Sequence, residues 1–347
     1  MKKKLWCLAV VLASFAASAS AATVEDFYKG KTIRIVVGFG PGGATDTNAR
    51  LLQRVLSKHI PGNPTIVVEN KPGGGSLLAA NTVYTTEPRD GTVIASFSSH
   101  LVVNQALDAP GVRFDAAKYQ WIASAFDSSA MCAVRTDSAV TRIEDIMGDR
   151  GKEVVVSSFG KGGLSHIEPV VFNAVFGARF KVITGYPGGA GQRLAVKNSE
   201  VQGFCTTFET IKTLEPGMFE GPAACCKVII IAGADVEEHR FLRGVPAAEK
   251  LAEKLGKSKD DLAMLRAMNA PNRISLPVAM APGVSEERVD AMRRAFQKAY
   301  ADLDFQAAAK KMNMDLQPKT GVEVSRIVQE LLSTPKPVLA RLKELIQ

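Results

Sequence analysis

The sequence predicts an α/β protein of two lobes, each a mainly parallel sheet flanked by helices. Strand-like apolar runs alternate with helically spaced apolar residues from residue 32 to residue 97, which is typical of βαβ units. The same alternation starts again at residue 153 and continues to residue 206, after an irregular stretch at 108–118. A chain of 347 residues also exceeds the size at which one core usually stops growing, so two lobes are expected.

The first 21 residues have the three parts of a secretory signal peptide. Residues 2–4 are lysines, residues 5–16 form an apolar run, and Ala-Ser-Ala at 19–21 forms a small-residue cleavage site. The apolar run is shorter than the roughly 20 residues of a membrane-spanning helix. We therefore expect cleavage after Ala21, which leaves a mature chain of 347 − 21 = 326 residues in the periplasm.

The first lobe is predicted to open with a strand at 32–38, where apolar and β-branched residues form a continuous run. Apolar residues then recur at helical spacing from 49 to 60, so a helix follows. A strand at 64–69, a helix at 76–84 and a strand at 92–97 continue the unit. Because each strand is followed by a helix, these strands should lie parallel.

The second lobe is predicted from the renewed alternation. Its strands are expected at 153–157, 180–184 and 201–206, and its helices at 164–176 and 192–197. Another strand starts at Lys227, followed by helices at 245–255, 260–268, 285–303 and 322–346 and a short strand at 277–281. We expect the chain to cross between the lobes near residues 125 and 228, so that the first lobe comprises 22–125 and 229–347 and the second 126–228.

The charge and the cysteine content favour small anions as ligands and argue against nucleic acid, metal ions and cofactors. The net charge of +8 falls to +5 when the three signal lysines are removed, which favours small anions. No basic patch interleaved with aromatic residues is present, so we expect no nucleic-acid binding. The four cysteines of the mature chain, Cys132, Cys205, Cys225 and Cys226, match no zinc spacing, and we expect neither metal nor cofactor. One bridge from Cys205 to Cys225 or Cys226 is a possibility, since the compartment is oxidising.

The stretch IRIVVGFGPGGATD contains a G-x-G-x-x-G motif in Gly38, Gly40 and Gly43, directly after the first strand. A glycine-rich turn into a helix presents free backbone N–H groups and the positive end of the helix dipole, which favour any anion. A dinucleotide site is one alternative, with Glu69 on the ribose. Three observations argue against a dinucleotide. Pro41 inside the motif lacks an N–H, the polar residues Thr45 and Asp46 stand after the motif where apolar residues normally pack the helix on the sheet, and the chain carries an export signal.

Five segments resemble motifs of the tripartite tricarboxylate transporter substrate-binding receptors, also called Bug receptors. They occur along this chain in the same order as in that family. These are IRIVVGFGPGGATDTNAR, VVENKPGGGSLLAAN, SSFGKGGLSH, ITGYPGGAGQRLAV and LPVAMAPGVSEERVDAMRRAF. The resemblance implies a type II periplasmic-binding-protein fold whose lobes close on a small organic carboxylate and deliver it to a membrane transporter with one large and one small subunit. It implies that backbone amides and waters from two glycine-rich loops hold the near carboxylate, without an arginine clamp.

The resemblance places the ligand-binding candidates on these two loops and on the facing lobe. From the first lobe they are Phe39, Gly42, Gly43, Ala44, Thr45, Asp46, Gly73, Gly74, Gly75 and Ser76, with Ser99 and His100 after the third strand. From the second lobe they are Lys161, Gly162, Ser165, His166, Tyr186, Gly188, Thr206 and Thr207. Asp46 is expected to cap the helix and brace its loop, or to hold a bridging water, rather than to touch an anion.

Two other functions remain as alternatives. An exported hydrolase is disfavoured because the chain has no G-x-S-x-G or H-E-x-x-H motif and no histidine beside a convincing serine or carboxylate pair. An exported sensor that reports to a membrane kinase would use the same ligand site, and the sequence does not distinguish it from a transport receptor. We expect a monomer that catalyses no reaction.

Overall fold

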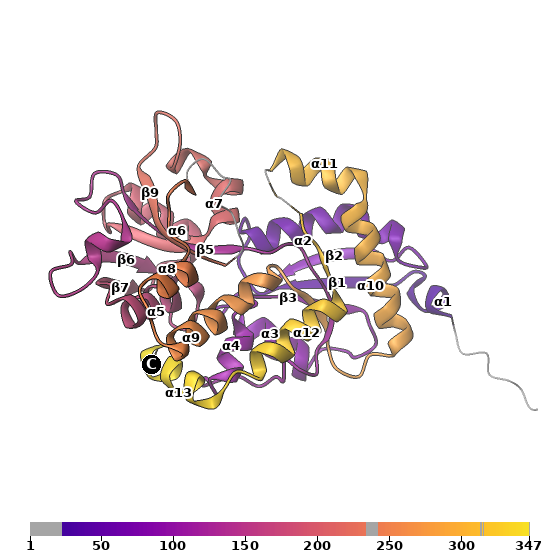
Figure 1. The fold of residues 1–347 in the computed structure, drawn as a ribbon. Coiled ribbons are helices and arrows are strands. Elements are labelled where there is room, and N and C mark those ends of the chain that lie inside the picture. The colour runs from indigo at the N-terminus through magenta and orange to yellow at the C-terminus, as the bar shows by residue number, and fades with distance from the viewer. Residues whose placement is uncertain (1–22, 234–241, 313, 315, 347) are drawn as a thin grey trace, which may run out of the picture.

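The computed structural model describes residues 23–233, 242–312, 314 and 316–346. The predicted signal peptide and its cleavage site after Ala21 lie outside the described residues. Two α/β lobes lie side by side, each built around one sheet (Figure 1). The predicted fold class is confirmed, with mixed sheets in place of mainly parallel ladders.

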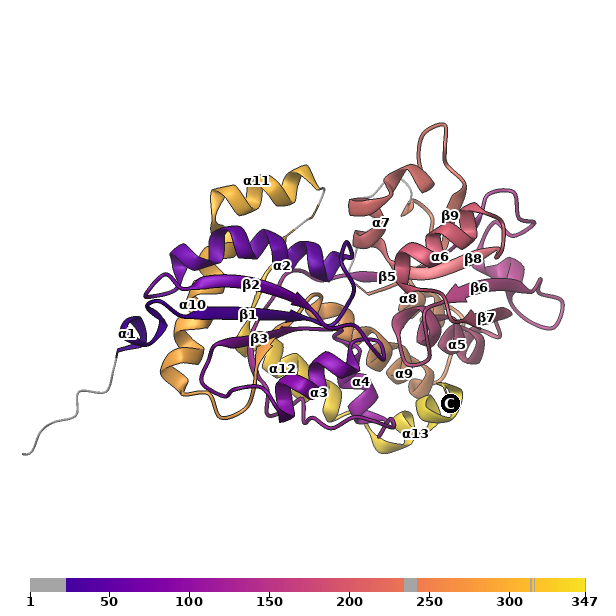
Figure 2. The same ribbon diagram turned by 180° about the vertical axis from the view of Figure 1, so that it is seen from behind.

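The first sheet has six strands in the order β11-β4-β10-β3-β1-β2. Its strands are β1 (Thr32–Val37), β2 (Thr65–Asn70), β3 (Val93–Ser96), β4 (Gln120–Ser124), β10 (Val278–Met280) and β11 (Lys319–Thr320). β1 pairs in parallel with β2 and β3, whereas β10 pairs antiparallel with β3 and β4. The β1–β3 strands therefore end at one edge of the sheet, and Figure 2 shows that this edge faces the second lobe.

The second sheet has five strands in the order β7-β6-β8-β5-β9. Its strands are β5 (Ser129–Arg135), β6 (Val154–Ser158), β7 (Phe180–Thr184), β8 (Gly203–Thr207) and β9 (Cys226–Gly233). β6 pairs in parallel with β7 and β8, and β5 runs antiparallel between β8 and β9.

The helices cover both sheets (Figures 1 and 2). They are α1 (Val24–Tyr28), α2 (Ala44–Val55), α3 (Leu77–Thr85), α4 (Leu101–Ala106), α5 (Leu164–Phe176), α6 (Gly188–Lys197), α7 (Phe208–Leu214), α8 (Ala248–Lys254), α9 (Lys259–Asn269), α10 (Glu286–Ala301), α11 (Leu303–Lys311), α12 (Gly321–Leu332) and α13 (Lys336–Ile346). Helices α2, α10 and α11 share one core cluster with β1. Helices α3, α4 and α12 belong to another cluster that continues into α5, α9 and α13, so one apolar core links the two lobes.

Local signals set several helix boundaries. α12 begins at Gly321 because Thr320 and Glu323 form a capping box, in which each side chain accepts the backbone N–H of the other. α5 ends at Phe176, and the following Gly177 has a φ of 66°, which glycine adopts easily. The helix predicted at 285–303 is α10 and ends at Ala301, because Asp302 leaves the helical conformation and accepts the N–H of Asp304 at 3.0 Å to start α11.

The sequence analysis missed α1, α4, β4, β5, α7, α11 and β11. β4 and β5 read QWIAS and SAMCAVR, which are poor in the β-branched residues that mark strands. All of β5 except its last residue is buried, because β8 and β9 pair with it from both sides. Its strand conformation therefore depends on partners that lie far away in the sequence.

The second lobe also extends beyond the predicted return at residue 228. β9 continues in the second sheet to Gly233, and α8 packs against it. α9 and α13 pack against α5, although the sequence analysis assigned them to the first lobe. The C-terminal segment thus contributes helices to both lobes, and the exact lobe boundaries stay a prediction.

The disulfide suggested between Cys205 and Cys225 or Cys226 is wrong. Cys132 on β5 and Cys205 on β8 face each other across the sheet and form the disulfide, with their Cα atoms 4.1 Å apart. Cys225 and Cys226 are free thiols, with Sγ atoms 3.6 Å apart. The pairing could not be found from the sequence because β5 itself was not predicted.

We predict that replacing both bridged cysteines, as Cys132→Ala with Cys205→Ala, lowers the free energy of unfolding by about 2 to 4 kcal/mol. The bridged cysteines are 73 positions apart in the sequence, so the disulfide closes a long loop in the unfolded chain. Loss of the disulfide therefore raises the conformational entropy of the unfolded state. Urea unfolding of the oxidised protein measures the effect, with the half-buried Cys225→Ser as control. Peptide mapping without reductant should recover the 132–205 link, and recovery of a link to 225 or 226 would contradict the assignment.

Candidate functional site

A cavity of about 370 Å³ lies between the two lobes. The first lobe contributes the loop that leads into α2 and the loop after β3, and the second lobe contributes the start of α6 and the end of β8. Residues near the strand crossings, among them Phe126 and Asn272, complete the wall. The cavity therefore lies at the edge where β1 and β3 end, which is the usual ligand position in an α/β fold.

The structure brings about half of the predicted site residues to this cavity. The lining includes Phe39, Gly42, Gly43, Ala44, Thr45, Ser99, His100, Gly188, Thr206 and Thr207. Among the described residues, those predicted for the site but outside this lining are Asp46, Gly73, Gly74, Gly75, Ser76, Lys161, Gly162, Ser165, His166 and Tyr186.

The first glycine-rich loop reaches the cavity at the N-terminus of α2. α2 begins at Ala44, and Gly43 before it has an extended conformation, so the first-turn N–H groups have no acceptor within the helix. Those N–H groups and the helix dipole make this part of the wall attractive to an anion. Gly42 has a φ of 82°, a conformation that other residues rarely adopt.

Asp46 braces this loop from behind, as expected from the sequence. One carboxylate oxygen accepts the Gly42 N–H and the Arg50 Nε–H, both at 2.9 Å, and the other accepts Nδ2–H of Asn70 at 2.8 Å. Asn70 also donates to the Phe39 carbonyl at 2.9 Å. Burial alone would raise the pKa of Asp46, but the hydrogen bonds from Arg50, Gly42 and Asn70 outweigh burial and lower it.

The second glycine-rich loop supports the first one instead of lining the cavity. Gly73, Gly74 and Gly75 are exposed, whereas Ser76 is buried and its Oγ accepts the Ser98 N–H at 2.9 Å. A Cβ on Gly38 would lie 2.3 Å from the Cβ of Ser76, so glycine at 38 allows the two loops to pack. The expectation that both loops open onto one cleft therefore does not describe this cavity.

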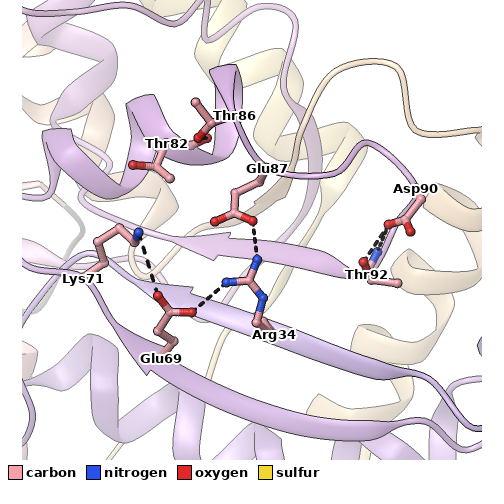
Figure 3. Close-up of polar contacts among 8 residues, drawn as sticks. All are labelled: Arg34, Glu69, Lys71, Thr82, Thr86, Glu87, Asp90 and Thr92. Carbon is pink, nitrogen blue, oxygen red and sulfur yellow. Dashed lines mark hydrogen bonds and ion pairs between the residues drawn. The ribbon is translucent and has the colours of Figure 1, made fainter.

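Glu69, the residue suggested for a nucleotide ribose, lies in a charge cluster on the first sheet (Figure 3). Arg34 Nη1 donates to it at 2.7 Å, and Lys71 Nζ lies 3.9 Å from its other oxygen. Arg34 also pairs with Glu87, which follows α3. Glu69 therefore joins β1 to β2 through Arg34, and it is not part of the cavity wall described above.

The remaining second-lobe candidates have structural contacts. Ser165 is buried, with its Oγ 3.0 Å from that of Ser158. His166 is buried, and its pKa is lowered by burial and by Lys161. A Cβ on Gly162 would lie 3.1 Å from Oδ1 of Asn104, which belongs to α4 of the first lobe. Gly162 thus lies where the lobes touch.

The sequence analysis missed much of the lining. Phe97, Phe126 and Phe159 add apolar wall beside Phe39, and Asn272 and Ser275 come from a segment that was assigned no site role. The most important omission is Arg193. The helix was predicted to start at Gln192, whereas α6 starts at Gly188, so Arg193 lies one turn after Gly189 on the same face. Extending the helix to Gly188 would have placed Arg193 at the cleft.

The charge of the lining is positive. Among the described residues it contains the guanidinium of Arg193 and no aspartate or glutamate. His100 adds no charge at neutral pH, because burial lowers its pKa to about 4. Within the described part of the chain, no group of three or more histidines, cysteines or acidic residues could hold a metal ion, and no helix is long and apolar enough to span a membrane.

Comparisons with known proteins agree on one family. The family model described as "Tripartite tricarboxylate transporter family receptor" matches residues 48–226, more than half of the chain. A UPF0065 protein of Bordetella pertussis is 27% identical over 222 residues. The match covers 63% of this chain and 66% of that protein, just under two thirds of its length.

Solved structures of similar fold include the periplasmic binding protein BugD, with a TM-score of 0.68 and 18% identity, covering 91% of this chain and 98% of that one. MatC from Rhodopseudomonas palustris, solved with bound malate, has a TM-score of 0.64 and 20% identity, covering 91% and 99%. At these identities the similarity concerns the fold, and the two-lobed α/β architecture is common to these proteins.

We predict that Asp46→Asn lowers the free energy of unfolding by about 1.5 to 3 kcal/mol at pH 7, because it weakens charge-assisted hydrogen bonds. The folded-state pKa of Asp46 lies below its ordinary value, so this stabilisation is present above the unfolded-state pKa of about 4. It is lost as the pH falls through the folded-state pKa. Urea unfolding between pH 7 and pH 3 should therefore show the difference from wild type shrinking with acidification.

The exposed Asp149, which lies in a turn outside the helices and strands, provides the matched control for Asp46→Asn as Asp149→Asn. This substitution should leave the free energy of unfolding nearly unchanged at both pH values. A deficit of Asp46→Asn that persisted undiminished at pH 3 would contradict the role of its charge.

Proposed function

The chain belongs to the tripartite tricarboxylate transporter family of receptors, and from this premise we propose that it is a periplasmic solute-binding protein that captures a small organic carboxylate by lobe closure. It delivers the ligand to a membrane transporter with one large and one small subunit. It carries out no covalent chemistry. The family match and the geometry of the cavity between the lobes support this proposal.

One observation carries the proposal. The N-terminus of α2 opens into the cavity between the lobes, and no acidic side chain of the described residues lines that cavity. Unpaired N–H groups at a helix N-terminus bind carboxylates through hydrogen bonds and the helix dipole. Gly43, Ala44 and Thr45 are therefore the proposed contacts for a ligand carboxylate, with Asp46 holding their loop in place.

Because the cavity lies between two lobes, a bound ligand can favour closure of the lobes. A ligand favours the closed form to the extent that it makes more contacts there than in the open form. The cavity wall comes from both lobes, so a ligand at the α2 terminus also contacts second-lobe residues such as Thr206 and Thr207. The malate bound to MatC, a protein of similar fold, is an example of such a ligand class.

The expected affinity is compatible with a receptor. Each hydrogen bond to a charged oxygen contributes about 1.5 to 3 kcal/mol. Three or four of them can reach the roughly 8 kcal/mol of micromolar binding after the costs of ordering.

Ala44→Pro tests the amide site directly. Proline fits the first position of a helix but lacks an N–H, so this change removes one donor while preserving α2. We expect carboxylates to raise the melting temperature of the wild-type mature protein, and Ala44→Pro to weaken their binding about tenfold in calorimetry. The matched control is Glu286→Pro, at the first position of α10 and away from the cavity. Equal binding by wild type and Ala44→Pro would contradict the amide site.

Delivery to a transporter requires a separate measurement in cells. Uptake of the carboxylate identified above should fall strongly when the gene for this protein is deleted, and it should return with the wild-type gene but less with Ala44→Pro. Unchanged uptake, together with a lost transcriptional response to the ligand, would favour the sensor alternative.

A further inference from the structure

Arg193 on α6 is a buried cation whose outer nitrogens, Nη1 and Nη2, make no hydrogen bond among the described residues. Its residue exposure is 7%, so more than nine tenths of it is buried. Its Nε donates to Glu215 at 2.9 Å, which fixes the direction of the guanidinium. Nη1 lies 3.2 Å from the position of a Cβ on Gly189, so the guanidinium points back along α6 to the first turn, which lines the cavity.

Glu215 holds Arg193 without cancelling the local charge. Lys197, one turn further along α6, also pairs with Glu215, so the three residues together carry a net charge of +1. Burial alone would raise the pKa of Glu215, but hydrogen bonds from Lys197 and Arg193 outweigh burial and lower it. Glu215 therefore stays ionised and acts as a positioning residue for Arg193.

Glu215 binds the guanidinium at Nε, but its outer nitrogens lie near the positive end of the α6 dipole. Cations are destabilising near a helix N-terminus, because the dipole is positive there. The residue before α6 is Pro187, which offers no side-chain acceptor to the first-turn N–H groups of Gly189 and Ala190. Backbone donors and the guanidinium thus lie on the same part of the wall, and among the described residues the guanidinium has a hydrogen bond from Nε to Glu215 and none from its outer nitrogens.

The two anion-attracting ends of the cavity come from different lobes. The α2 terminus belongs to the first lobe, and the α6 terminus with Arg193 belongs to the second. The wall also contains apolar side chains such as Phe39, Phe97 and Phe159. A ligand with a carboxylate at each end and an apolar linker between them would match this distribution.

We propose that Arg193 and the first turn of α6 form a second anion subsite, and that this subsite makes the receptor selective for ligands with two separated carboxylates. The inference rests on the proposed carboxylate-binding function and extends it to the second lobe. The proposed subsite differs from the site that the family resemblance implies, in which backbone amides hold the carboxylate, because here an arginine side chain binds the second carboxylate. Closure is then favoured by the second negative charge.

Matched ligand pairs test the subsite. The probes are adipate with hexanoate, and terephthalate with 4-methylbenzoate, which differ within each pair by one carboxylate. Calorimetry of the wild-type mature protein should give an affinity at least about tenfold higher for the dicarboxylate of the pair that binds. Arg193→Gln should remove most of that preference by weakening the dicarboxylate about tenfold and the monocarboxylate much less, whereas Arg193→Lys should retain part of the preference.

Two further variants keep the test informative if Arg193→Gln folds poorly. Gly189→Ala places a methyl group against Nη1 without altering any charge, and it should reduce the preference for the dicarboxylate several-fold. Arg179→Gln removes an exposed arginine of the same lobe that is not part of the wall, and it should leave both affinities unchanged.

The outcomes separate the two proposals. Loss of the preference in Arg193→Gln and Gly189→Ala, with monocarboxylate binding preserved, supports the subsite. Binding of both members of a pair with equal affinity by wild type, or equal weakening of both by Arg193→Gln, overturns the subsite and leaves the carboxylate receptor intact. If the wild-type protein binds none of the four carboxylates, the proposed function fails and the subsite fails with it.

Discussion

The hydrogen bonds of Asp46 are the constraint on which the candidate site depends. They fix a glycine-rich loop, residues 39–43, that has no polar side chain of its own, and Asp46 is not part of the cavity lining. Because the carboxylate is occupied by Gly42, Arg50 and Asn70, its negative charge is compensated behind the loop. The N–H groups of the first turn of α2 therefore face the cavity without a competing anion beside them.

The rest of the first lobe positions the first turn of α2 opposite the second lobe. Parallel pairing of β1 with β2 and β3 brings the strand ends to the same edge, and the packing of Ser76 against Gly38 sets the separation of the loops after β1 and β2. A single apolar core cluster continues from α12 to α13 and α5, so the lobes are joined on the side away from α2 and α11 (Figure 1). Such a connection favours a hinge motion in which the cavity side opens and closes.

The two lobes attract an anion to the cavity in different ways. The first lobe offers backbone dipoles, which have a fixed direction and need no side-chain ordering. The second lobe adds a full charge on Arg193, whose side-chain entropy is already reduced by the bond to Glu215. A wall with these two ends and aromatic side chains is better suited to anions with a carbon framework than to sugars or amines.

The sequence by itself determined the family, the fold class and the position of the first glycine-rich loop between a strand and a helix, because these depend on local glycine and strand signals. It left open whether Asp46 holds that loop or a bridging water. The tertiary structure alone decided the rest. β5 and the Cys132–Cys205 bridge required strand partners far away in the chain, and the packing of the second glycine-rich loop against the first depended on the contact of Ser76 with Gly38. Arg193 is one arginine among many in the sequence, and its place in the cavity follows from where α6 begins and from a carboxylate that lies 22 residues further along the chain.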